Sequence, residues 1–284
     1  MRKLPEDYII RKIKEFLDED LPDGDITTES IFKKHHYSKN HITAILQAEE
    51  DLIFAGEQLL PYFFDNKCEI KLFAQDGNTI KNNEVIAEIN GLSDLILSRE
   101  RVMLNLMQRL CGIATLTKKY SDIAKPYSVK ILDTRKTTPG LRLFEKYAVT
   151  VGGGYNHRLD LSSGILIKDN HIKAAGGIKN AIELAKSNKK NLKVEIEVEN
   201  LQEIKEALEV GVDGFLLDNM NPQKTKEMVN FIRSNGNKEI FIESSGGINL
   251  ENLKDYVTTG VNAISSGALT HSVKSSNIHL EFKI

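Results

Sequence analysis

Positively charged residues follow two short apolar runs in the second half of this sequence. Arg135 and Lys136 come after the apolar segment 129–132, and Lys168 comes after the segment 165–167. Arg and Lys bind carboxylate and phosphate groups, so this placement predicts a pocket for a ligand with several negative charges. The cations of this group are Arg135, Lys136, His157, Arg158 and Lys168.

Carboxylates follow the next two apolar runs. Glu195, Glu197 and Glu199 alternate along and just after the segment 194–198, and Asp218 follows the segment 214–217. Carboxylates at such positions can accept hydrogen bonds from sugar hydroxyls or hold Mg²⁺ through oxygen ligands. Spacing alone does not choose among the three glutamates, because any of them could merely line the edge of a barrel.

Glycine-rich turns follow the last two apolar runs, at Ser245-Gly246-Gly247 and at Ser266-Gly267. Glycine lets a ligand approach the backbone closely, and backbone N–H groups that precede a helix favour an anion. Two such turns on neighbouring strands predict a phosphate site. A third glycine run, Gly152-Gly153-Gly154, precedes His157 and Arg158, where it could be a flexible turn or could position them.

The elements that must carry these residues alternate between strand and helix. Strands are predicted over residues 129–132, 165–167, 194–198, 214–217, 240–242 and 263–264, and helices over 178–185, 201–210, 222–232 and 250–257. Alternating βα units predict a parallel sheet, and strands this short and regularly spaced favour an α/β barrel. The functional residues of such a barrel lie at the C-terminal ends of its strands, where the polar residues stand here.

The first third of the chain has a different pattern. Apolar residues at helical spacing predict a helix that the turn residues 21–25 end, and alternating segments at 42–48, 69–73 and 85–89 predict strands. A long helix is predicted from Ser93 to Leu110, and the alternating tail 277–283 predicts a last strand. We therefore expect an N-terminal α+β domain over residues 1–110, joined by a C-terminal strand at about 273–284, and a barrel over 111–272.

The composition of the 284-residue chain is that of an ordinary globular protein, with 40% hydrophobic and 27% charged residues and a formal net charge of -2. Nothing in this balance indicates nucleic acid or a membrane as a partner, and neither a signal peptide nor an apolar span is evident. Cys68 and Cys111 lack metal-site spacing and are expected to be reduced thiols of a cytoplasmic protein. His35-His36 has no further metal ligand at a plausible spacing and is interpreted as a solvated turn.

Several longer strings resemble the quinolinate phosphoribosyltransferase family. The resemblance extends over residues 13–281, nearly the whole chain. In the second half it is carried by Asp133-Thr134-Arg135-Lys136-Thr137-Thr138-Pro139-Gly140, Gly152-Gly153-Gly154-Tyr155-Asn156-His157-Arg158, Leu166-Ile167-Lys168-Asp169-Asn170-His171, Leu217-Asp218-Asn219-Met220, Glu243-Ser244-Ser245-Gly246-Gly247 and Ser266-Gly267-Ala268-Leu269-Thr270-His271. In the first third it is carried by Glu19-Asp20-Leu21 with Gly24-Asp25-Ile26-Thr27-Thr28, and by Glu100-Arg101, Asn105-Leu106, Gln108-Arg109-Leu110 and Gly112-Ile113-Ala114-Thr115.

This resemblance implies a pentosyltransferase with an incomplete α/β barrel (a type II phosphoribosyltransferase) packed with the smaller N-terminal domain. It implies a homodimer, with a hexamer as a further possibility, and a reaction of quinolinate with phosphoribosyl pyrophosphate that gives nicotinate mononucleotide, CO₂ and pyrophosphate for NAD biosynthesis. It also implies Mg²⁺, held by Glu197 and Asp218 and mainly through the pyrophosphate.

The resemblance also assigns roles to individual residues. It implies that quinolinate contacts Arg135, His157, Arg158, Lys168 and Arg101, the last from the neighbouring subunit. It implies that Lys136 and Lys168 face the pyrophosphate, and that Thr137, in the same loop as Lys136, also binds substrate. The 5′-phosphate side has Ser245, Gly246, Gly247, Ser266 and Gly267. The implied catalytic residues are Lys136, Lys168, Glu197 and Asp218.

Two residues depart from the family pattern in the loop between Arg158 and Lys168. Asp160 stands where a small residue is usual, and Ser163 stands where Asp is common. The rival interpretations are a superfamily relative of the kind found in molybdenum operons, a non-catalytic sensor of a phosphorylated metabolite, and a Schiff-base aldolase built on Lys168. The string from Lys168 to His171 argues against the first, the cations and carboxylates together against the second, and the polar neighbours of Lys168 against the third.

Overall fold

The computed structural model describes residues 3–32, 41–188 and 191–283. The predicted turn at His35-His36 lies outside these residues. The described chain divides into two compact units. The first contains residues 1–118, 140–153 and 273–284, and the second contains residues 119–139 and 154–272.

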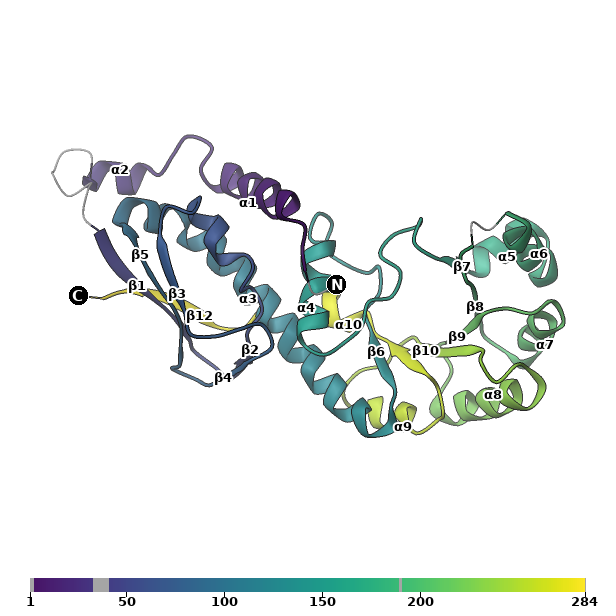
Figure 1. Cartoon of the computed structure of the whole chain (residues 1–284). Helices are drawn as coiled ribbons and strands as arrows, with labels where there is room; N and C mark the ends of the chain where they lie inside the picture. The colour runs from purple at the N-terminus through teal and green to yellow at the C-terminus, as the bar shows by residue number, and fades with distance from the viewer. Residues whose placement is uncertain (1–2, 33–40, 189–190, 284) are drawn as a thin grey trace. The chain divides into compact units, whose positions relative to one another are not determined.

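The first unit is an antiparallel sheet with helices (Figure 1). The sheet order is β12-β1-β5-β3, so the C-terminal strand β12 pairs with β1. A separate pair joins β2 and β4. The elements are α1 (Glu6–Asp20), α2 (Ile26–Phe32), β1 (His41–Ala48), β2 (Leu52–Ile53), η2 (Leu60–Phe64), β3 (Glu69–Leu72), β4 (Thr79–Ile80), β5 (Val85–Leu92), α3 (Ser93–Ala124), α4 (Arg142–Val151) and β12 (Ile278–Phe282).

The second unit is an α/β barrel that strand pairing leaves open. Its six strands are parallel in the order β6-β11-β10-β9-β8-β7, which leaves β6 and β7 as the two edges of the described sheet. The strands are β6 (Lys130–Leu132), β7 (Ile165–Ile167), β8 (Val194–Val198), β9 (Gly214–Asp218), β10 (Phe241–Ser245) and β11 (Ala263–Ser265). This incomplete α/β barrel with a separate N-terminal α+β domain confirms the predicted fold class.

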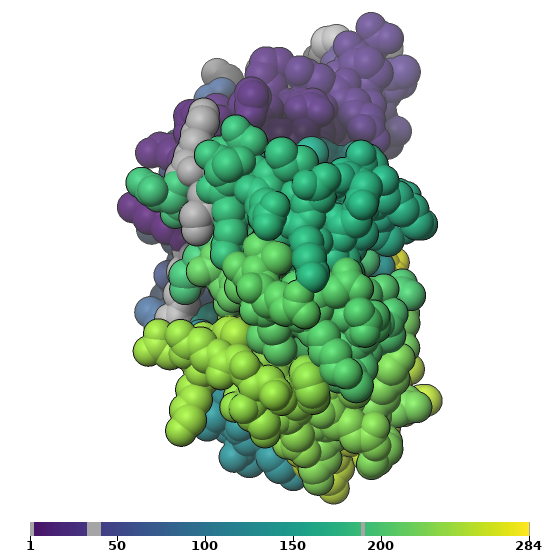
Figure 2. Space-filling view, turned by 90° about the vertical axis from the view of Figure 1, so that its right-hand side faces the viewer, coloured from purple at the N-terminus to yellow at the C-terminus, as the bar shows by residue number. Residues whose placement is uncertain are grey.

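The helices α6 (Ile178–Asn188), α7 (Leu201–Val210) and α8 (Pro222–Asn235) lie along the outer side of this curved sheet (Figure 1), and Figure 2 looks onto the side of the molecule where the green segments that contain them lie. The other helices of this unit are η3 (Lys125–Tyr127), α5 (Asp169–Ala175), α9 (Leu253–Val257) and α10 (Ala268–His271). Local sequence sets where α7 and α8 begin. The side chains of Asn200 and Asn221 accept hydrogen bonds from the backbone N–H groups of Glu203 and Lys224, which satisfies donors that a helix start leaves open.

The helix α4 was not predicted, and it belongs to the first unit although the predicted boundaries place it in the barrel. The carboxylate of Glu145 is fully buried and pairs with Arg109 of α3, and the hydroxyl of Tyr147 donates to Asp76. The ring of Phe144 packs against Tyr8 of α1, with ring centroids 5.1 Å apart. Both ends of α4 lead into the second unit, at residues 139 and 154.

The helix α3 extends to Ala124, 14 residues beyond its predicted end at Leu110 (124 − 110). Gly112 and the β-branched residues after it obscure the helical pattern in the sequence. In the structure, a Cβ on Gly112 would overlap the carbonyl oxygen of Lys274 and lie 3.1 Å from the Cα of Ser275. Glycine is therefore needed there for a close backbone contact and does not end the helix.

Among the described residues, no helix combines the length and the apolar character that crossing a membrane requires. Cys68 and Cys111 are both free thiols, and Cys111 is buried. Burial raises the pKa of the Cys111 thiol to about 12, so it stays protonated and unreactive at neutral pH.

Candidate active site

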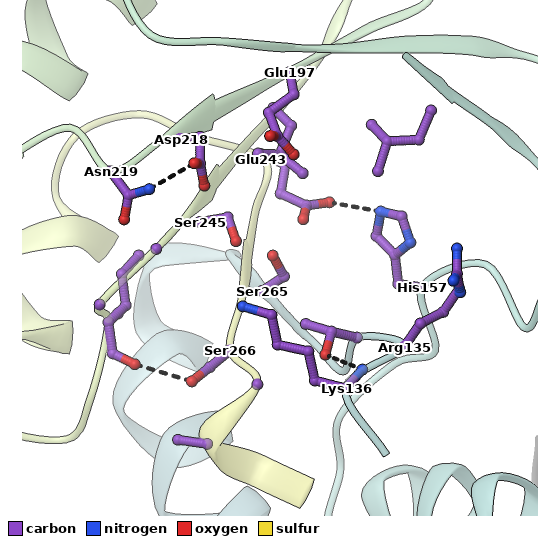
Figure 3. A pocket seen from close by; sticks show the side chains of 18 of the residues that line it. Arg135, Lys136, His157, Glu197, Asp218, Asn219, Glu243, Ser245, Ser265 and Ser266 are labelled. Atoms are coloured by element: carbon purple, nitrogen blue, oxygen red, sulfur yellow. Dashed lines mark hydrogen bonds and ion pairs between the residues drawn. The ribbon is translucent and has the colours of Figure 1, made fainter. Parts of the chain in front are cut away.

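One cavity of about 770 Å³ lies at the C-terminal ends of the barrel strands (Figure 3). The loops after β6, β7, β9, β10 and β11 all contribute to it, together with the segment around His157. It brings together twelve of the fourteen residues predicted for the site: Arg135, Lys136, His157, Arg158, Lys168, Glu197, Asp218, Ser245, Gly246, Gly247, Ser266 and Gly267.

Arginines on two separate segments form the cationic side. Burial lowers the pKa of Arg158, and the positive charge of Arg135 lowers it further. The Nε atom of Arg135 is buried and has no hydrogen-bond acceptor among the described residues. Buried donors in native proteins are normally satisfied. Two neighbouring guanidinium groups, one with an unused buried donor, therefore indicate a site for an anion.

The two cationic segments are tied together by Asp133, which is fully buried at the end of β6. Its carboxylate accepts hydrogen bonds from the Asn156 side-chain amide at 2.6 Å and from the His157 backbone N–H at 2.9 Å. Bonds to a buried carboxylate are strong because the charge assists them. Asp133 therefore sets the position of His157 and Arg158 relative to the Arg135 loop.

Carboxylates and a lysine lie on the neighbouring wall. Lys168 forms an ion pair with Glu197, whose side chain is only 14% exposed. Burial raises the pKa of Asp218, and the nearby negative charge of Glu197 raises it further. The two carboxylates thus repel one another in a partly buried site, and a cationic ligand or a sugar hydroxyl would relieve that repulsion.

The structure separates the three glutamates of β8 that the sequence leaves equivalent. Glu197 lines the cavity. Glu195 lies on the same face of the strand but farther from its end, where its carboxylate is 3.4 Å from the Nε2 atom of His157. Glu199 is exposed just beyond the strand, where its backbone N–H donates to Glu203. Side-chain direction and strand length together make Glu197 the glutamate of the site.

Glycine backbone forms the third wall. Gly246 and Gly247 have φ values of +93° and +64°, in the left-handed region. Within the described part of the chain, their backbone N–H groups donate to no acceptor. Successive open N–H groups in such a turn form a concave site for an anion. Ser266 differs, because its hydroxyl donates to the carbonyl oxygen of Ile248 and its backbone N–H to that of Leu132. It therefore holds the neighbouring loop in place.

Two predicted residues lie outside the cavity lining. The Thr137 hydroxyl donates to the carbonyl oxygen of Arg135 at 3.5 Å and so supports the loop from within. Arg101 is exposed on α3 in the first unit.

Other lining residues were not predicted to bind substrate, notably Asn219 and Glu243. Asn219 donates to the Asp218 carboxylate at 2.6 Å. The sequence signal for Glu243 is a charged residue directly after an apolar strand core.

The two departures from the family pattern form a turn of their own. The Asp160 carboxylate accepts from the backbone N–H and the hydroxyl of Ser162, and the Ser163 hydroxyl accepts from the backbone N–H groups of Leu159 and Asp160. Bonds from the side chain and then the backbone of Ser162 hold the pKa of Asp160 below its usual range. Arg158 and Lys168, on either side of this loop, both line the cavity.

A cation-rich pocket beside a glycine turn with open backbone N–H groups, at the C-terminal ends of the strands of an α/β barrel, is typical of an enzyme with an anionic substrate. The chain belongs to the quinolinate phosphoribosyl transferase family. The model of the family's N-terminal domain matches residues 25–111, and that of its C-terminal domain matches residues 113–281.

Individual relatives agree over nearly the full length. A Bacillus subtilis (strain 168) protein, the probable nicotinate-nucleotide pyrophosphorylase (carboxylating), is 42% identical over 273 residues, which cover 95% of this chain and 91% of the relative. The Methanocaldococcus jannaschii protein of the same name is 41% identical and covers 97% of this chain and 98% of its own. The solved structure of the nicotinate-nucleotide pyrophosphorylase from Francisella tularensis has a TM-score of 0.91 at 36% identity, and covers 99% of this chain and 98% of that one.

Gly246→Ala is expected to lower kcat/KM for phosphoribosyl pyrophosphate on the order of 100-fold, as misplaced binding groups do. The added Cβ would overlap the Asn219 side-chain oxygen and lie 2.8 Å from its backbone nitrogen. Steady-state kinetics with that substrate varied would measure the loss. Gly176→Ala is the matched control, because Gly176 has a similar φ of +80° but nothing within 4 Å of the added atom. Equal activity of the two variants would contradict the glycine cradle.

Proposed function

We propose that this protein is a quinolinate phosphoribosyltransferase, a pentosyltransferase that makes nicotinate mononucleotide for NAD biosynthesis. Quinolinate and phosphoribosyl pyrophosphate are the substrates, and CO₂ and pyrophosphate are the other products. One observation carries the proposal: in a chain of this family, a single cavity joins two arginines, a carboxylate pair and a glycine cradle. The arginines suit the two carboxylates of quinolinate, the carboxylate pair suits the ribose, and the glycine turn suits the 5′-phosphate.

The residues of the cavity are assigned by their chemistry. Arg135 and Arg158 bind the quinolinate carboxylates, with Lys168 and the segment of His157 beside them. Lys136 and Lys168 face the pyrophosphate. Glu197 and Asp218 lie toward the ribose, where they accept bonds from its hydroxyls and stabilise positive charge. Gly246, Gly247 and Gly267, with Ser245, surround the 5′-phosphate.

The reaction follows from this placement. The bond between ribose C1 and the pyrophosphate oxygen breaks, and the oxygen keeps the electron pair while lysine charges stabilise it. Positive charge grows on C1 and the ring oxygen near the carboxylates. The quinolinate nitrogen then bonds to C1, and the cationic ring favours loss of the adjacent carboxylate as CO₂, after which that carbon takes a proton. No protein nucleophile is needed, because positioning two anionic substrates supplies much of the catalysis.

We further propose Mg²⁺ as the cofactor. Hard oxygen ligands suit this ion, and Glu197 and Asp218 supply two carboxylates. Burial raises the pKa of Asp218, and the negative charge of Glu197 raises it further. Lys168 and Asn219 each engage one of these carboxylates, so the ion would also depend on pyrophosphate oxygens. When bound, it would stabilise the negative charge of the leaving group.

The assembly and location are also proposals. We propose a cytoplasmic homodimer, which could assemble further into a hexamer. Exposure of Arg101 on α3 is compatible with its donation to the active site of the neighbouring subunit. Neither nucleic acid nor a membrane is proposed as a partner.

The proposed function is tested by mixing the protein with Mg²⁺, phosphoribosyl pyrophosphate and quinolinate. Nicotinate mononucleotide and CO₂ are followed over time, and a parallel tube contains nicotinate in place of quinolinate. Product only with quinolinate is the expected result, because Arg135 and Arg158 would bind its two carboxylates and nicotinate has only one. Absence of product in both tubes from folded protein would point to a superfamily relative with another acceptor.

A further inference from the structure

The His157 ring in the cavity wall has both of its nitrogens engaged by the protein. The Nδ1 atom accepts the backbone N–H of Arg158 at 2.8 Å. Since an acceptor nitrogen carries no proton, the neutral ring has its proton on Nε2. That atom lies 3.4 Å from a carboxyl oxygen of Glu195. It also lies 3.5 Å from a carboxyl oxygen of Glu243, a contact that Figure 3 marks with a dashed line.

Glu243 is a buried acid that has no role in the proposed reaction. Its side chain is 0% exposed, and one carboxyl oxygen lies 3.5 Å from the Nε2 atom of His157, longer than an ordinary hydrogen bond. The hydroxyl of Ser265 also interacts with this carboxyl group. Burial raises the pKa of Glu243, and the charge of Glu195 raises it further. Burying a carboxyl group costs folding free energy unless the group is hydrogen-bonded or paired. Figure 3 shows the Glu243 carboxyl group pointing at His157.

We propose that Glu243 is a positioning residue of this active site: it holds the Nε2 side of the His157 ring, so that Nδ1 fixes the backbone of Arg158 and directs its guanidinium into the cavity. Two contacts thus connect Glu243 on β10 to the His157 ring and the His157 ring to Arg158, which is assigned to a quinolinate carboxylate. The role of Arg158 rests on the proposed function, whereas the link itself does not.

The same atoms raise the alternative of a metal site. The ligand atoms of His157, Glu195 and Glu243 lie within 4.8 Å of one another, a spacing that a divalent cation could bridge. The guanidinium charges of Arg158 and Arg135 argue against it, because Arg158 interacts electrostatically with both Arg135 and Glu195. A cation here would compete with Arg158 for the Glu195 carboxylate and would be repelled by the Arg158 guanidinium group. We therefore assign the cluster to positioning and make metal binding an outcome of the test.

Glu243→Leu removes the fully buried one of the two carboxyl groups that face the Nε2 atom of His157 and leaves Glu195 in place. The KM for quinolinate is expected to rise about 10- to 100-fold, by analogy with the loss of a residue that orients a metal-binding histidine, while the KM for phosphoribosyl pyrophosphate stays within about twofold. Glu243→Gln keeps an oxygen acceptor in the shape of the protonated acid and is expected to restore most of the quinolinate affinity. Glu199→Leu, at an exposed acid near the end of β8, is the matched control.

Nitrogen-15 NMR of His157, assigned with His157→Asn, gives a second readout. Wild-type and Glu243→Gln proteins are expected to show the Nε2-protonated tautomer, and Glu243→Leu a mixture. This readout holds even if the wild-type protein makes no nicotinate mononucleotide, a result that would overturn the proposed function alone.

An unchanged tautomer in Glu243→Leu would overturn the positioning role. So would equal losses for both substrates together with a lowered melting temperature. Loss of quinolinate binding after removal of divalent cations, reversed by Zn²⁺ in wild-type but not in Glu243→Gln protein, would replace it with a metal site.

Discussion

Arg158→Ala is expected to raise the KM for quinolinate by about 30-fold to several thousand-fold, and Arg135→Ala should act in the same way. Truncating one partner of a desolvated charge pair costs roughly 2–5 kcal/mol, and about 1.4 kcal/mol corresponds to a factor of ten. Both residues line the cavity. Burial lowers the pKa of Arg158 and the positive charge of Arg135 lowers it further, so an anion bound between the two arginines would be favoured. Steady-state kinetics with quinolinate varied at saturating phosphoribosyl pyrophosphate would measure the effect.

Lys173→Ala is the control for this prediction. Lys173 is an exposed cation on α5, near Lys168 in the chain, and pairs with the exposed Asp169 at 3.4 Å. Its removal tests whether a general loss of positive charge weakens binding, and we expect a change of less than about twofold because exposed pairs contribute little. An unchanged KM for quinolinate in both arginine variants would refute the assignment of the cationic wall.

Arg109→Met is expected to lower the free energy of unfolding by about 3–5 kcal/mol, the cost of removing one partner of a buried ion pair. Arg109 is 23% exposed and its partner Glu145 is fully buried. The pair joins α3 to α4 inside the first unit, so the loss should appear as a lower urea midpoint of that unit. Urea denaturation followed by circular dichroism would measure it.

The exposed pair of Lys14 and Asp18 provides the comparison. These side chains are 73% and 64% exposed, so Lys14→Met should change the free energy of unfolding by less than about 1 kcal/mol. A similar midpoint for the two variants would mean that the Arg109–Glu145 pair does not anchor α4.

The residues that line the site could be predicted from the sequence because strands and turns depend mainly on interactions between residues close together in the chain. Apolar runs of β-branched residues indicate strands, and the polar residues after each run lie at the same end of a parallel sheet. Hence Arg135, Lys168 and Asp218 could be grouped from the sequence, and the structure brings them into one cavity. The glycines at 246 and 247 were recognisable for the same reason, since an open turn needs residues without a Cβ.

Contacts between distant segments explain why the sequence pattern predicted neither α4 nor the full length of α3. Glu145 and Lys146 have the residue types of a helix surface, yet both are fully buried, because partners from other elements surround α4. Gly112 resembles a helix end but allows the backbone near Lys274 to pass close by. Propensity describes a residue's preference for its own backbone and carries no information about which distant segment packs against it.

The sequence by itself therefore determined the family, the α/β architecture and the residue types of the site. Only the tertiary structure decided which glutamate of β8 faces the cavity. It also showed that the Ser266 hydroxyl donates to a neighbouring loop and that the Glu243 carboxyl group lies 3.5 Å from the Nε2 atom of His157. The physical reason is that burial, side-chain direction and hydrogen-bond partners arise from contacts between residues far apart in the chain. Those contacts exist only once the strands have paired.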